Sequence, residues 1–277
     1  ILEKACYLAQ NGRPGPVLID VPMNFQKTEI KEHELKRFKA PKKNINKDLL
    51  KKNIKKIHSA LKNSSKPVIL LGGGVKIAKV ENNIHKFLKK LDVPVVTTWS
   101  GVDILDHDNR NYIGNVGVYG SRAANFAVQN SDLLLCLGSR LDTRITGGVP
   151  SSFARKAKII SVDIDKHELS KKRGLKLFLK INSNLSDFFY MINKENKKFE
   201  YKNSTWLNKC VNWKKKYPIV KDEYYSQKKY VNPYVFINEL SKILDKKSVV
   251  IADDGGHLTW TIQSFKVKKG QKVFSAF

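Results

Sequence analysis

Three consecutive glycines, Gly72 to Gly74, are the first residues in the sequence whose type and position could do chemistry. They follow the apolar run Val68–Leu71, which has the composition of a strand buried on both faces. Glycine has no Cβ, so a phosphate or another backbone can approach it closely. Glycines at the carboxyl end of a parallel strand are typical of nucleotide sites in α/β sheets. A tight strand-to-helix turn without a ligand explains the same residues.

Three further features follow other predicted strands or precede a predicted helix. The turn Gly117–Ser121 precedes a helix, Arg140 and Arg144 follow the apolar run Leu133–Leu137, and Asp163 ends another run. Because the carboxyl ends of parallel strands share one edge, we expect these residues to line a crevice with the glycines. The guanidinium groups could bind phosphate oxygens, and the carboxylate could accept from ribose hydroxyls. A helix cap and surface ion pairs with Asp142 are the plainer explanations.

The segment Asp253–His257 is a second and separate candidate site. It follows the apolar run Val249–Ala252, and its glycines, Gly255 and Gly256, precede a predicted helix. The amino end of a helix offers free N–H groups and a positive dipole end to a diphosphate, and His257 would add a side-chain donor. A capped turn without a ligand is the alternative.

The contiguous glycines differ from the fingerprint of a nicotinamide dinucleotide site. That fingerprint needs spaced glycines and an acidic residue about 20 positions further on, at the end of the next strand. The next predicted strand here ends in Thr97, Thr98 and Trp99. The sequence therefore disfavours a dehydrogenase that transfers hydride.

Strand-like and helix-like stretches alternate from residue 46 to residue 193 and predict an α/β fold with a parallel sheet, that is, a Rossmann-like domain. Within it we expect helices over 46–62, 81–91, 121–129 and 185–192, and strands over 68–71, 94–98, 133–137, 158–162 and 175–181. Residues 99–120 appear as an irregular passage before the helix at 121. Outside this domain we expect helices over 1–10, 206–216 and 232–244, and strands over 17–21 and 249–252.

Composition shifts divide the chain into five parts. Residues 1–27 end one domain, 28–45 form a charged linker, 46–193 form the central domain, 194–230 form a second linker, and 231–277 begin a further domain. The sequence begins at Ile1 without an initiator Met and stops after a strand-like segment. We therefore expect a piece of a longer polypeptide.

Charge and cysteine content exclude several classes of protein. The net charge of the 277 residues is +27, but the lysine pairs are scattered, whereas a nucleic-acid-binding protein gathers its charge on one face. No apolar run approaches the length of a membrane span, and no signal peptide pattern is present. The three cysteines are far apart and predict neither disulfides nor a zinc site. We expect a cytoplasmic protein without nucleic-acid or membrane partners.

Five motifs occur in one order across nearly the whole chain: GRPGPVLIDVP (Gly12–Pro22), the glycine triplet, LGSRLDTRITGG (Leu137–Gly148), VDID (Val162–Asp165) and the DDGGH turn. This ordered set resembles the thiamine diphosphate-dependent acetolactate synthase family, large catalytic subunit. The resemblance implies three α/β domains. Residues 1–27 would end the pyrimidine-binding domain, 46–193 would be the central FAD-type domain, and 231–277 would begin the diphosphate-binding domain.

The resemblance also implies which residues contact the cofactors. Thiamine diphosphate would meet Gly255, Gly256 and His257. The implied FAD contacts are Arg13, Gly72, Gly73, Gly74, Thr98, Gly117, Tyr119, Gly138, Arg140, Arg144 and Asp163. The sequence departs from the family at four positions: Tyr119 replaces a common His, Gly256 a frequent Gln, Met23 a frequent Lys, and Asn182 a common Asp beside the flavin. These departures bear on the substrate and on whether FAD is retained.

The activity implied by the resemblance is a carboligation in branched-chain amino acid synthesis, in which a 2-oxo acid such as pyruvate loses CO2 and is joined to a second carbonyl. The glutamate that activates thiamine would lie before Ile1, and the Mg²⁺ ligands would lie after Phe277. We therefore expect no catalytic or metal-binding residue in this chain and no turnover by it alone. The family's shared active sites imply a homodimer or tetramer, and a regulatory subunit is a further expected partner. The alternatives are a thiamine-dependent decarboxylase or lyase of a surface-sugar pathway and a non-catalytic nucleotide-binding module.

Overall fold

The computed structural model describes residues 1–41, 46–194 and 200–275. The chain divides into two compact units, Ile1–Lys47 and Asp48–Phe277, which are described separately. The predicted linkers 28–45 and 194–230 and the predicted domain 231–277 each include a few residues outside the described ranges. The five-part domain division stays a prediction.

The first unit contains short helices and extended chain. The expected helix over residues 1–10 is confirmed as α1 (Leu2–Gln10), and α2 (Met23–Gln26) and the 3₁₀ turn η1 (Glu32–Glu34) follow it. The Glu3 carboxylate accepts a hydrogen bond of 2.9 Å from the Phe38 N–H, and this bond ties α1 to the later chain.

The expected strand over residues 17–21 is wrong. These residues are extended but unpaired, and the Leu18 side chain is 89% exposed. A strand needs a neighbouring backbone to pair its N–H and C=O groups, and residues 1–41 contain no strand with which it could pair. The apolar run alone therefore does not produce a strand here.

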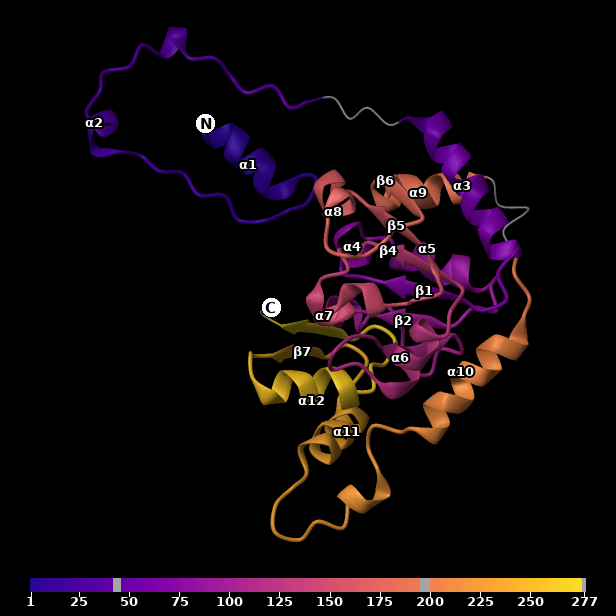
Figure 1. Ribbon diagram of the computed structural model, residues 1–277. Helices are drawn as coiled ribbons and strands as arrows, with labels where there is room; N and C mark the ends of the chain where they lie inside the picture. Colours follow the sequence, from indigo (N-terminus) through magenta and orange to yellow (C-terminus); the bar gives the residue numbers. More distant parts are fainter. Residues whose placement is uncertain (42–45, 195–199, 276–277) are drawn as a thin grey trace. The chain divides into compact units, whose positions relative to one another are not determined.

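The second unit is built on a six-stranded parallel sheet, which confirms the expected α/β fold (Figure 1). The strand order is β3-β2-β1-β4-β5-β6, so successive strands run outward from β1 in one direction and from β4 in the other. The strands are β1 (Pro67–Leu71), β2 (Val95–Thr97), β3 (Tyr112–Asn115), β4 (Leu133–Leu137), β5 (Lys158–Asp163) and β6 (Leu179–Asn182).

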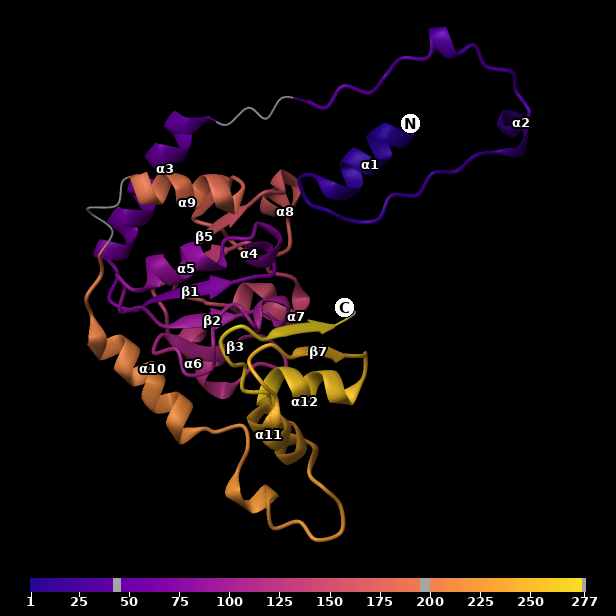
Figure 2. The same cartoon turned by 180° about the vertical axis from the view of Figure 1, so that it is seen from behind.

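Helices cover both faces of this sheet (Figures 1 and 2). Alternate residues of a strand point to opposite faces, so Ile69 and Leu71 of β1 join one core while Val68 and Leu70 join the other. The first core includes buried side chains of α3 (Lys47–Lys62), α5 (Glu81–Leu88) and α9 (Leu185–Lys194), and the second includes those of α6 (Arg122–Gln129) and α10 (Ser204–Lys216). The continuous apolar runs of β1 and β4 are explained by this burial on both faces.

Local chemistry fixes the ends of several helices. The apolar residues of α3 recur every three or four positions, so one stripe of the helix is buried. The Ser121 hydroxyl accepts from the Ala124 N–H at 3.2 Å and begins α6. Asn232 accepts from the Tyr234 N–H at 3.0 Å and, with Pro233 in the first turn, begins α11 (Pro233–Ile243).

The sheet differs from the sequence expectation at its two edges. Strand β3 lies inside the passage expected to be irregular. It was not expected because it is a short edge strand that contains Gly114 and lacks an apolar run. Strand β6 begins at Leu179 instead of residue 175. Short helical turns that were not expected follow three strands: α4 (Gly74–Ile77), α7 (Thr143–Thr146) and α8 (Lys166–Ser170).

The stretch expected to be a second linker contains α10, which packs onto the central sheet. The Trp206 indole N–H donates to the Pro67 carbonyl at 3.1 Å, and Leu207 and Cys210 are buried in the second core. The expected helix over residues 206–216 is therefore confirmed as part of α10, and its apolar face belongs to the core of this unit.

The end of the chain forms a two-stranded parallel sheet with two helices. It contains α11, β7 (Val249–Ala252), α12 (Gly256–Ser264) and β8 (Lys272–Ser275), which confirms the helix expected over 232–244 and the strand expected over 249–252. The Gln263 side chain donates to the Tyr119 carbonyl at 2.6 Å and ties α12 to the larger sheet. Among the described residues, no helix is long and apolar enough to cross a membrane.

Candidate functional site

The predicted FAD contacts of the second unit follow the carboxyl ends of four neighbouring strands, and one of them, Asp163, is the last residue of a fifth. Gly72 to Gly74 follow β1, Thr98 follows β2, and Asp163 ends β5. Gly117 and Tyr119 come after β3, and the residues from Gly138 to Arg144 come after β4. Because all these strands are parallel, the residues share one edge, and its centre is the β1–β4 boundary where the strand order changes direction. The structure thus brings them to the same edge of the sheet.

The glycine triplet packs directly against the loop after β4. The Gly72 N–H donates to the Leu137 carbonyl at 2.9 Å, and the Gly74 N–H donates to the Gly138 carbonyl at 3.0 Å. A Cβ added at Gly72 would lie 2.2 Å from the Gly138 carbonyl oxygen. Glycine is therefore required at residues 72 and 74 by the close approach of two loops of the chain itself.

The loops after β2, β3 and β4 meet at Trp99. The Arg144 guanidinium lies 5.7 Å from the centre of the Trp99 ring, and the Tyr119 ring lies 5.5 Å from it. The Val118 N–H donates to the Arg144 carbonyl at 2.9 Å. Trp99 is buried and was not among the predicted contacts, although its position directly after Thr98 at a strand end was a usable signal. Cation–π stacking orients the Arg144 side chain along this edge.

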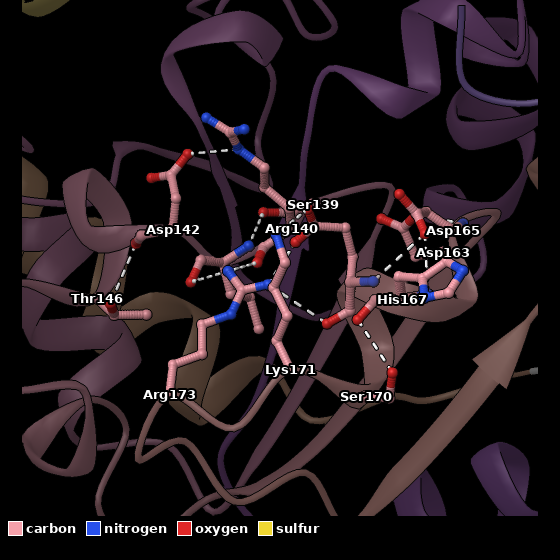
Figure 3. Close-up of polar contacts among 12 residues, drawn as sticks. Ser139, Arg140, Asp142, Thr146, Asp163, Asp165, His167, Ser170, Lys171 and Arg173 are labelled. Atoms are coloured by element: carbon pink, nitrogen blue, oxygen red, sulfur yellow. Dashed lines mark hydrogen bonds and ion pairs between the residues drawn. The ribbon is translucent and has the colours of Figure 1, made fainter.

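Arg140 and Asp163 already have partners in the chain (Figure 3). The Arg140 Nε donates to Asp142 at 2.9 Å, and the Arg140 side chain is 54% exposed. Asp163 accepts from the Asp165 N–H at 2.9 Å, and Asp165 in turn caps α8 through the His167 N–H. The plainer explanations, an ion pair with Asp142 and a helix start, are thus present alongside the shared edge.

A small pocket between the ends of β4 and β5 is lined by Arg140, Asp163, Glu168 and Arg173. Its volume of about 20 Å³ has room for roughly one water molecule. Arg173 donates to the Arg140 carbonyl at 2.7 Å and forms an ion pair with Glu168, whose side chain is only 6% exposed. Sequence reasoning did not identify Arg173 or Glu168, because their proximity depends on α8 folding back over the strand ends.

The second candidate site lies at the amino end of α12. Gly255 has φ of +130°, a conformation that favours glycine, and α12 begins without a side-chain cap. His257 is exposed, and the Asp254 carboxylate accepts from the Gly255 N–H at 3.0 Å. Leu258 of α12 packs in one cluster with Trp99, so this turn adjoins the edge described above. An uncapped helix start offers its first N–H groups to an anion.

The remaining groups that could do chemistry are buried or unclustered. Burial raises the pKa of the Cys210 thiol to about 12 and also raises the pKa of the Cys136 thiol, so neither forms a thiolate at neutral pH. Among the described residues, no group of three or more His, Cys, Asp and Glu side chains could hold a metal ion. Arg13 belongs to the first unit, and its predicted role stays a prediction.

Comparison with known proteins shows what the chain is similar to. Residues 54–187 match the family described as thiamine pyrophosphate enzyme, central domain. Over these residues the chain is similar to the central domain of thiamine pyrophosphate enzymes. The matched residues lie inside the central domain expected from the sequence, and the fold described above is consistent with that domain.

The similar proteins are acetolactate synthases. The chain is 32% identical over 289 residues to the acetolactate synthase large subunit of Cyanidium caldarium, with 100% of the chain and 48% of the relative covered. It is 28% identical over 278 residues to the large subunit of Lactococcus lactis, covering 100% and 47%. It is 29% identical over 282 residues to the chloroplastic enzyme of Arabidopsis thaliana, covering 100% and 41%. The family resemblance inferred from the motifs is confirmed, and the chain spans about half the length of these relatives.

Proposed function

We propose that the protein is a thiamine diphosphate-dependent carboligase of the acetolactate synthase type. It would decarboxylate pyruvate and join the product to a second 2-oxo acid, as in branched-chain amino acid synthesis. The observation that carries this proposal is the similarity of the whole chain to acetolactate synthase large subunits. The fold supports it, because the residues named from the resemblance in the second unit lie at one sheet edge and at the helix start beside it.

The amino end of α12 would hold the diphosphate of thiamine. Its uncapped N–H groups and positive dipole end suit an anion, and His257 is exposed beside them. Gly256 supplies a backbone N–H where the family often has a glutamine side chain. Bound thiamine diphosphate would supply the electron sink for decarboxylation. Mg²⁺ would accompany the diphosphate, although the described residues contain no metal-binding cluster.

The edge of the central sheet would hold FAD, and its donor set fits an anionic dinucleotide in sign and position. Arg144 is exposed and oriented by Trp99, and Arg140 is exposed beside it. Both would neutralise the diphosphate, while Asp163 would accept from ribose hydroxyls. Three of the glycines, Gly72, Gly74 and Gly138, would shape the loops and would not leave room for FAD themselves. Neighbouring backbone atoms already occupy the space where their Cβ atoms would lie.

The assembly and location follow the same proposal. We infer a homodimer or tetramer, with a regulatory subunit as a further partner, acting in the cytoplasm. The net charge of +27 suits the recruitment of 2-oxo acid anions.

The test is an assay of the complete protein that contains this chain, with pyruvate, thiamine diphosphate, Mg²⁺ and FAD. We expect acetolactate, and we expect Gly255→Ala to weaken thiamine diphosphate binding by about tenfold because φ of +130° strains any residue with a Cβ. Gly148→Ala, which has no neighbour within 4 Å of its added Cβ, is the matched control. CO2 release without acetolactate would indicate a lyase instead, and binding of FAD without binding of thiamine diphosphate would indicate a non-catalytic nucleotide-binding module.

A further inference from the structure

A cavity of about 460 Å³ lies beside the turn Gly117–Ser121, which contributes Ser121 to its lining. Its walls are residues 107–110 and 112–115, which lead into and form the edge strand β3, Ser121 and Ala123 at the start of α6, the end of α10 with residues 217–220, and the end of α12 with residues 265–266. These elements belong to the second unit, and Figure 2 shows β3, α10 and α12 together in it. The volume falls in the range of about 300–1,000 Å³ that is typical of small-molecule pockets. None of the residues predicted to contact FAD or thiamine diphosphate lines it.

One part of the cavity wall is apolar. It includes Ile113 of β3, Ile262 of α12 and Phe265, all buried, together with the half-buried Ile219 and Val220. Aliphatic and aromatic side chains from three separate elements therefore converge on one space. Such a wall favours a ligand with an apolar body, because burying that body releases ordered water.

The charged residues of the lining are mostly cationic. Arg110, Lys214, Lys215 and Lys266 line the cavity, and Asp108 is the carboxylate among its lining residues. Arg110 is paired with Asp92 at 3.4 Å. Lys215 and Lys266 are exposed, and neither side chain forms an ion pair or hydrogen bond with another residue that the structure describes. Two ammonium groups thus remain available to an anion.

The buried polar groups of the lining are consistent with a positive potential. The Lys214 ammonium donates to the carbonyls of His107 at 2.9 Å and Tyr112 at 3.0 Å, so it is held inside the wall. Burial lowers the pKa of Lys214 to about 8. Burial, with Lys214 and Lys266 nearby, lowers the pKa of His107 to about 4, so its imidazole is neutral at pH 7.

We propose that this cavity binds a small monocarboxylate with an apolar body, its carboxylate at Lys215 and Lys266 and its body against Ile113, Ile219 and Phe265. A cation is disfavoured by the lining charges. A polyphosphate is also a poor match, because its several negative charges outnumber the two available ammonium groups and Asp108 would repel it. A single carboxylate matches the two available ammonium groups.

The site would contact the carboxyl end of α12, whose amino end carries Gly255 to His257. A ligand here would therefore touch the same helix as the proposed diphosphate site, but from its other end. The binding proposal does not depend on thiamine chemistry, because the measurement that tests it is binding of the carboxylate alone.

The probe is 4-phenylbutyrate, compared with its neutral amide by isothermal titration calorimetry at pH 7. We expect the acid to bind at least about tenfold more tightly than the amide, which corresponds to about 1.4 kcal/mol. The double variant Lys215→Gln/Lys266→Gln should lose about tenfold in affinity for the acid and keep its affinity for the amide. Lys269→Gln is the matched control, because Lys269 is exposed in the same segment but does not line the cavity.

A second variant tests the apolar wall. Val220→Trp places a larger side chain at the cavity from a residue outside regular helix or strand, and it should abolish binding of both probes while the far-ultraviolet circular dichroism is unchanged. The proposal is overturned by absence of acid binding at millimolar concentration. Equal affinity for acid and amide, an equal loss in Lys269→Gln, or undiminished binding in Val220→Trp would overturn it as well.

Discussion

The six-stranded sheet and the two-stranded sheet of the second unit are stabilised in different ways. All five residues of β1 are buried, whereas Ile251 of β7 is 77% exposed and Phe274 of β8 is 48% exposed. The larger sheet carries a core on each face. The smaller sheet is fixed partly by polar contacts: Lys76 pairs with Asp103 at 2.8 Å, and Asp103 accepts from the Val273 N–H at 3.0 Å.

The proposed function requires that the loops at the edge of the larger sheet and the amino end of α12 both be held in place, and the two are held differently. The larger sheet can position the loops at its edge through its own packing, since those loops interlock through Gly72, Gly74 and Gly138. Helix α12 is positioned by the loops of the larger sheet, because Leu258 near its amino end packs with Trp99 and Gln263 near its carboxyl end donates to the Tyr119 carbonyl. The Asp103 ion pair holds β8. Substitutions in the two regions should therefore differ in how far their effects spread.

The largest effect is expected at Gly72. Gly72→Ala places a Cβ 2.2 Å from the Gly138 carbonyl oxygen, at the centre of the larger sheet. We expect a loss of more than about 4 kcal/mol in the free energy of unfolding, or failure to fold. Urea denaturation followed by circular dichroism measures it. Gly148→Ala, with no neighbour within 4 Å, should change stability by less than about 0.5 kcal/mol.

The next largest effect is the loss of stability when an apolar side chain is removed from each sheet. Leu70→Ala removes a fully buried side chain from β1 and should cost about 2–5 kcal/mol. Ile251→Ala in β7 should cost less than about 1 kcal/mol, because that side chain is mostly in water. Thermal unfolding of both variants checks the difference. Equal losses would contradict the comparison.

The Asp103 ion pair tests how the smaller sheet is held. The Asp103 side chain is fully buried, so Asp103→Ala leaves Lys76 and the Val273 N–H without their partner and should cost about 3 kcal/mol. Hydrogen exchange should accelerate first in β8, while β1 stays protected. Asp103→Asn keeps an acceptor for the Val273 N–H and should lose less. Uniform acceleration across both sheets would refute a local role for Asp103.

The smallest effect is a pH dependence from His107, beside the edge strand β3. Its pKa of about 4 in the folded chain lies below the ordinary value of 6.5, so the unfolded chain binds this proton first as the pH falls. Stability therefore decreases from about pH 6.5 towards pH 4 and is unaffected by this group at higher pH. Between pH 7 and pH 5 we expect a loss of about 1–2 kcal/mol from His107. Urea midpoints of wild type and His107→Gln should converge as the pH falls; parallel curves would contradict the assignment.

The sequence predicted the centre of the fold better than its edges. Continuous apolar runs identified β1 and β4, because strands buried on both faces lack polar alternation. Edge strand β3 was missed because it is stabilised by pairing with β2 and has no pattern of its own. The run at residues 17–21 was predicted as a strand for the opposite reason, since it has the pattern but no partner.

The candidate site could be predicted only in part for the same reason. Strand ends in the sequence indicate one shared edge, so the placement of Gly73, Arg144 and Asp163 followed from the parallel sheet. Which loops touch depends on strand order, which the sequence does not state. The Gly72–Gly138 contact and the position of Trp99 between Arg144 and Tyr119 were therefore found only in the structure.

Titration of FAD into the complete protein, followed by the change in flavin fluorescence, tests most directly whether the edge of the larger sheet binds a dinucleotide. The wild type should bind, and Arg144→Gln should weaken binding by about tenfold. Arg155→Gln should change it less than about twofold, because Arg155 is an exposed arginine that precedes the amino end of β5. Absence of FAD binding by the wild type, or equal affinities of the two variants, would contradict the account.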